Sequence, residues 1–71
     1  MMAILLSVRL LAAGELEIQE YRVGLMDLNS GRVVNVVTTD KRFFEHRRGS
    51  CVVARPLHDG RVYYGGDCNA R

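Results

Sequence analysis

The sequence predicts a mainly β domain, a small antiparallel sheet or open barrel in the order β-β-β-α-β-β with one short helix near residues 41–48. Three observations predict it. Runs rich in Val, Leu and Tyr alternate with polar residues, Gly-containing turns separate these runs, and 71 residues without a linker or repeat suffice for one domain, residues 1–71. Short strands joined by tight turns favour a curled sheet with the helix covering one end.

Met1–Gly14 is open to three interpretations. As a strand, it places alternate apolar residues on one face, namely Met2, Ile4, Leu6, Val8 and Leu10. As a helix it would end at Gly14, and as a secretory signal it would be cleaved near Ala12-Ala13-Gly14, although Arg9 interrupts the apolar run. We favour the strand, which fits a cytoplasmic protein, whereas a signal would imply a periplasmic or secreted one. The run is too short to span a bilayer, which needs about 20 apolar residues.

Glu15–Leu28 resembles a long strand whose alternation slips twice, so we expect a bulge near Gln19 or Glu20 and another near Gly24. Asn29-Ser30-Gly31 predicts a three-residue turn with Gly31 left-handed. Arg32–Thr39 then returns as an antiparallel strand rich in β-branched residues.

The segment Asp40–Gly49 predicts a helix of about two turns. Asp40 is a suitable N-cap and Gly49 a suitable stop. His46, Arg47 and Arg48 would then lie in the last turn, where the helix dipole favours cations.

Ser50–Cys68 predicts a β-hairpin turned at Asp59-Gly60. A two-residue loop places Cys51 opposite Cys68, which predicts a disulfide between them. Pro56 would then occupy a hydrogen-bonded position, so this strand must be an edge or carry a bulge. The alternative, a three-residue loop of residues 58–60, shifts the register by one and separates the cysteines.

The two-residue loop also sorts the hairpin side chains into two faces. Cys51, Val53, Leu57, Val62 and Cys68 should face the core. Pro56, His58, Arg61 and Tyr63 should face outward, and their composition is that of a protein contact surface. The exposed edge of such a hairpin could also add a partner strand.

Charge is unevenly distributed. Residues 1–40 hold three arginines against five acidic residues, and residues 41–71 hold seven cations against three acidic residues. The basic half contains two adjacent phenylalanines, Phe43 and Phe44, of which we expect one in the core. The cations and the exposed aromatic suit a nucleic-acid or protein contact, and the candidates are Lys41, Arg42, Phe44, Arg47 and Arg48.

The sequence gives little support for a catalytic site or a metal-binding site. Cys51 with His46 or His58 could form a thiol and base, but no third group is placed by a recognised spacing. The same residues lack the paired-ligand spacing of zinc sites. We therefore expect no enzymatic activity, no cofactor and no metal.

These features predict a non-catalytic protein-binding module, a small inhibitor or accessory subunit of the kind that phages and mobile elements encode. One alternative is an RNA or single-stranded DNA binder, and another is a secreted or periplasmic domain stabilised by its disulfide. Because a core of this size is marginal, a homo-oligomer is a further expectation. The run Tyr21–Val37 is similar in pattern to many small β modules, including SH3-like barrels, and that similarity carries no function.

Overall fold

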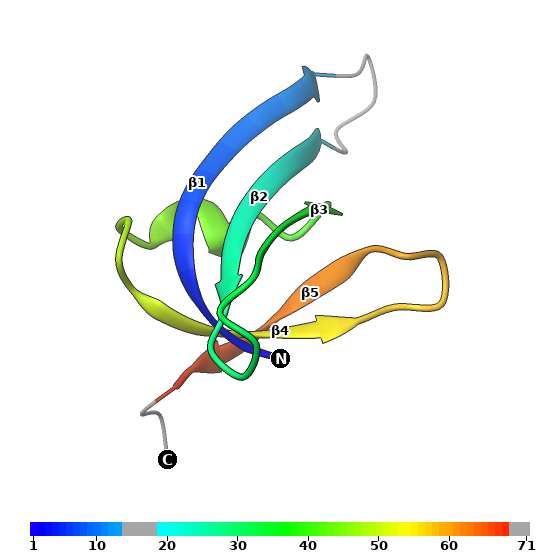
Figure 1. The fold of residues 1–71 in the computed structure, drawn as a ribbon. Helices are drawn as coiled ribbons and strands as arrows, with labels where there is room; N and C mark the ends of the chain where they lie inside the picture. Colours follow the sequence, from blue (N-terminus) through cyan, green and yellow to red (C-terminus); the bar gives the residue numbers. More distant parts are fainter. Residues whose placement is uncertain (14–18, 69–71) are drawn as a thin grey trace.

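The computed structural model describes residues 1–13 and 19–68, which form one antiparallel sheet of five strands and a short 3-10 turn. The mainly β prediction is confirmed. The elements are β1 (Met2–Ala13), β2 (Gln19–Asp27), β3 (Val33–Thr38), η1 (Lys41–Glu45), β4 (Cys51–Pro56) and β5 (Val62–Asp67). The strands lie in the order β3-β2-β1-β4-β5, and Figure 1 shows β1 and β2 curving together while the β4–β5 hairpin crosses near the start of β1.

β1 is the middle strand of the sheet, so the strand interpretation of the first segment is confirmed and the helix interpretation is wrong. It pairs with β2 along its length but with β4 only from Met2 to Ile4. Within residues 2–11, the fully buried side chains are Ala3 and Leu5, which lie on the opposite face from Met2 and Ile4. Gly14, the predicted end of the helix or signal, lies outside the described residues.

The β1–β2 ladder contains two bulges, opposite the predicted positions near Gly24 and Glu20. The extra residue of each bulge, however, belongs to β1 and not to β2. The register shifts between Leu5 and Ser7, opposite Gly24, and again between Leu10 and Ala12, opposite Glu20. β2 itself keeps one phase and pairs with β3 as well as with β1. An extra residue in β2 would disturb two ladders, whereas the distal half of β1 is paired on one side only. The predicted strand residues 15–18 lie outside the described residues.

The turn between β2 and β3 is one residue longer than predicted. The Asp27 N–H donates to the Arg32 carbonyl at 2.8 Å, which leaves residues 28–31 as the loop. Gly31 is left-handed as predicted, with φ at 72°. The following strand, β3, confirms the prediction for residues 32–39.

The predicted two-turn helix is wrong, because residues 41–45 form only a 3-10 turn. Asp40 does cap it, accepting from the Arg42 N–H, but His46, Arg47 and Arg48 follow the turn rather than completing a helix. Only Phe43 of this element is buried. One buried side chain offers too little packing to stabilise the several turns that an isolated helix needs.

The β4–β5 hairpin has a three-residue loop, so the two-residue prediction is wrong near the turn. The Leu57 N–H donates to the Arg61 carbonyl at 2.7 Å, and Gly60 has φ at 83°. A second register shift follows Val52, on the side where Gly66 has φ at 112°. The three-residue loop shifts the register by one residue, and the extra residue of the bulge in β5 shifts it back, so the two shifts cancel. Cys51 and Cys68 therefore face each other after all, 5.4 Å apart at Cα and placed as a disulfide.

The one-residue shift near the turn exchanges the predicted faces of β4 but not those of β5. Val52, Ala54 and Val62 are the buried residues, while Leu57 is exposed. Cys51, Val53 and Cys68, predicted to face the core, are only partly buried. Val62 was the member of the predicted core set that the structure places fully inside.

Two side-chain bonds join the outer strands and curl the sheet. The buried Thr38 hydroxyl donates to the Val62 carbonyl at 2.6 Å, and the Tyr64 N–H donates to Asp40 Oδ2 at 2.9 Å. The hydrophobic core comprises residues from four strands and η1, namely Ala3, Leu5, Val23, Leu25, Phe43, Val52, Ala54 and Val62. In the described residues, no helix has the length and apolar character required to cross a membrane.

Candidate binding surface

The structure separates the four hairpin residues predicted as a contact face. Arg55 pairs with Tyr63, and Pro56 pairs with Val62 on the other face. Arg61 and Tyr63 lie two residues apart and share the outward face, while His58 is in the loop. Arg61 is already engaged, 3.6 Å from both Glu20 and Asp59. Only Arg61 and Tyr63 therefore remain together of the predicted set.

The basic aromatic segment is divided by the 3-10 turn. Phe43 is fully buried, as expected for one of the two phenylalanines, and Phe44 is 61% exposed. Successive residues of a 3-10 turn point about 120° apart, so the neighbours cannot both reach the core. The Phe44 ring lies against Tyr21, with centroids 5.8 Å apart.

The predicted cations have different roles. Arg42 donates to both Asp40 carboxylate oxygens and lies over the Tyr64 ring, which gives it a structural partner. Lys41, Arg47 and Arg48 are exposed. Of these three, Arg48 lines a groove with Phe44.

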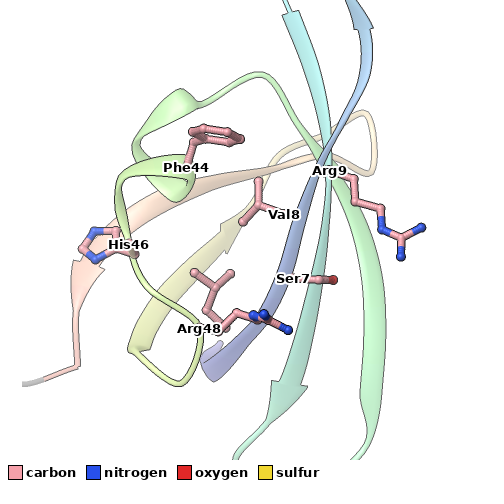
Figure 2. A pocket seen from close by; sticks show the side chains of 7 residues that line it. Ser7, Val8, Arg9, Phe44, His46 and Arg48 are labelled. Atoms are coloured by element: carbon pink, nitrogen blue, oxygen red, sulfur yellow. The ribbon is translucent and has the colours of Figure 1, made fainter.

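This groove, which we call the Phe44 groove, has a volume of about 420 Å³ and lies between β1 and the segment after η1. Its lining residues are Leu5, Ser7, Val8, Arg9, Phe44, His46 and Arg48. Figure 2 shows Val8 pointing toward Phe44, whereas Ser7 and Arg9 point to the opposite side of β1. The groove thus has an apolar side at Val8 and Phe44 and a cationic end at Arg48.

One edge of β1 runs beside this groove. The Leu5 N–H donates to the Ser50 carbonyl, and the Leu5 carbonyl accepts from the Gly49 N–H. Beyond Leu5, within residues 1–13 and 19–68, this edge of β1 has no further backbone partner. We call residues 6–11 the open edge of β1. Leu10 and Leu11 on it are 50% and 45% exposed.

His46 is held at the rim of the Phe44 groove by an aromatic contact. Its ring lies 4.7 Å from the Tyr64 ring, and its Nδ1 is 3.7 Å from Asp67. Burial and the hydrogen bond that the Tyr64 hydroxyl donates to Asp67 raise the pKa of Tyr64 to about 12. The Tyr64 hydroxyl therefore keeps its proton, and with it the hydrogen bond to Asp67, further into alkaline pH than an exposed tyrosine does.

A second, polar pocket of about 270 Å³ lies on the other side of β1, lined by Ser7, Arg9, Arg22 and Asn35. Sequence reasoning assigned these residues no functional role. The available signal was a pair of polar residues, Ser7 and Arg9, inside an otherwise apolar run. In the described part of the chain, no group of three His, Cys, Asp or Glu side chains could hold a metal ion.

Comparison of the chain with protein-family models, with curated proteins and with solved structures finds no match.

Proposed function

We propose that this protein is a non-catalytic protein-binding module that adds an extended segment of its partner as a strand along the open edge of β1. The observation that supports this most is the juxtaposition of that edge with the exposed Phe44 ring. In the described residues, the edge leaves backbone donors and acceptors without a protein partner.

Backbone geometry supports this mode of binding. In an antiparallel ladder alternate residues direct their N–H and C=O groups to each side, so the open edge presents a row of groups that a partner strand can pair. Main-chain bonds of this kind supply affinity, and pockets for alternate side chains supply specificity. The Phe44 groove is such a pocket, with Val8 and Phe44 as its apolar side.

Charge indicates the kind of segment that would bind. The described residues that line the groove include the cation Arg48 and His46 and no acidic residue, while Arg9 borders it with its side chain on the other side of β1 (Figure 2). A partner segment that contains apolar and acidic residues would place apolar side chains by Phe44 and a carboxylate by Arg48. Pairing of two copies through this edge would bring like charges together, which opposes self-association here.

Selection from a displayed peptide library, followed by titration of the selected peptide, tests the proposal. Phe44→Ala should weaken binding by about tenfold or more, as loss of a central aromatic anchor does. Tyr63→Ala is the matched control, because Tyr63 is an exposed aromatic outside the groove.

The opposite pattern would place the contact on the hairpin. If Tyr63→Ala or Arg61→Ala weakens binding and Phe44→Ala does not, the originally predicted outward face is the site and the open-edge proposal is wrong.

A second candidate function, binding of RNA or single-stranded DNA, is favoured by one observation: the exposed Phe44 ring shares its groove with Arg48. A base could stack on Phe44 while Arg48, Arg47 and Lys41 contact phosphates. Such binding would weaken steeply with salt because counterions are released. A fluorescence titration with an oligonucleotide at two salt concentrations separates this candidate from peptide binding.

A further inference from the structure

The polar pocket is assembled by three neighbouring strands. Gly24 of β2 pairs with Ser7 of β1 on one side and with Asn35 of β3 on the other. Two pairs along the same ladder, and so on the same face, Arg9 lies directly opposite Arg22. Directly opposed residues in an antiparallel sheet share a face, so two guanidinium groups, a hydroxyl and an amide gather over Gly24.

Gly24 keeps the floor of this pocket clear of a side chain. A Cβ at this position would lie 2.6 Å from Ser7 Oγ and 3.6 Å from Asn35 Oδ1. The space above the backbone is therefore bordered by the two polar groups rather than by an apolar side chain of β2.

The hydrogen-bonding capacity of these side chains is largely unused. In residues 1–13 and 19–68, neither Arg9 nor Arg22 has a carboxylate within 4.0 Å. In the same residues, the side chains of Ser7 and Asn35 make no hydrogen bond. Two like charges placed directly opposite each other destabilise a sheet. A bound anion would remove that repulsion and satisfy the donors.

We propose that Ser7, Arg9, Arg22 and Asn35 form a binding site for a phosphoryl group, as inorganic phosphate or as a phosphate monoester. Such a group carries close to two negative charges at neutral pH and three strong acceptor oxygens. Guanidinium groups match it in charge and in fork geometry. Ser7 and Arg9 also border the Phe44 groove, but their side chains point to the other side of β1 from Val8 and Phe44 (Figure 2), where Arg22 and Asn35 complete the pocket. The site therefore does not depend on the open-edge proposal.

Titration with inorganic phosphate, followed by NMR of the backbone amides at constant ionic strength, tests the proposal. Saturable shifts should be centred on residues 7, 9, 22, 24 and 35. Arg22→Gln should lower the affinity by about tenfold, as loss of one charge-assisted hydrogen bond does. Arg55→Gln is the control, since Arg55 is exposed, lies on β4 and lines neither the groove nor the pocket. Asn35→Ala, at an exposed position, provides a second variant should Arg22→Gln fold poorly.

Two further ligands identify the source of the phosphoryl group. A phosphoserine peptide that binds more tightly than inorganic phosphate, with the same Arg22 dependence, assigns the site to a phosphorylated partner, whereas equal or weaker binding assigns it to free phosphate. An oligonucleotide that shifts these residues when both monophosphates fail would overturn the proposal in favour of nucleic acid. Shifts that chloride reproduces, or that Arg55→Gln reduces as much as Arg22→Gln, would also overturn it.

Discussion

Asp40 connects three parts of the chain through one carboxylate. It accepts from the Arg42 backbone N–H at 3.1 Å, from the Arg42 guanidinium at 2.9 and 2.6 Å, and from the Tyr64 N–H at 2.9 Å. These bonds, first of all that from the Arg42 side chain, lower the pKa of Asp40 to about 2. The same residue therefore caps η1 and joins the end of β3 to β5.

The depressed pKa predicts a loss of stability in acid. The contribution of ionised Asp40 is complete above the unfolded pKa of about 4 and is lost as the pH falls toward the folded pKa of about 2. Asp40→Asn should lower the free energy of unfolding by about 1–2 kcal/mol at pH 7 and by much less at pH 2. Urea unfolding at both pH values measures this difference. Glu45→Gln, at an exposed position of the same turn, should change little. An Asp40→Asn effect of equal size at both pH values would show that the charge is not responsible.

Among the elements, the strands were predictable and their registers were not. The β-branched residues of 33–38 and the left-handed Gly31 are local features, so sequence alone indicates them. The β4–β5 register depends on two offsets that cancel, one at the loop and one beside Gly66, and no local pattern reveals their sum. The 3-10 turn was predicted as a longer helix because capping residues do not report how much of a helix will be buried.

Some residues of the two candidate sites could likewise be predicted from the sequence, and others could not. Phe44 and Arg48 are close in sequence and stood out as an aromatic among cations. Ser7, Arg22 and Asn35 are separated along the chain and meet only because three strands pair around Gly24. The register that brings them together cannot be read from the sequence, so the sequence does not predict the polar pocket.

We expect the disulfide that closes the hairpin to contribute substantially to the free energy of unfolding. Cys51 and Cys68 are 17 residues apart, and in the chain-entropy model a crosslink closing such a loop stabilises the folded state by about 3 kcal/mol. The Cys51→Ser/Cys68→Ser double variant should lose most of this in chemical denaturation. Unchanged stability in the variant, with the wild type shown by mass spectrometry to be oxidised, would contradict this account of the hairpin.

At the scale of the whole molecule, the sheet is closed on one side and open on the other. Thr38 and Asp40 connect β3 to β5, while β1 is 12 residues long and pairs with β4 at three positions only. The distal half of β1 is consequently an edge in the middle strand of the sheet, beside Phe44. This arrangement, rather than the hairpin tip, is the feature of the fold that a partner strand would complete.

Hydrogen exchange of the backbone amides at residues 6–11, measured with and without a selected peptide, tests this claim most directly. Alternate amides of the open edge should exchange rapidly in the free protein and become protected in the complex, while the Val23 amide in doubly paired β2 should be protected in both. The proposal is contradicted if the edge amides are already protected in the free monomer, or if they stay unprotected when the peptide is bound.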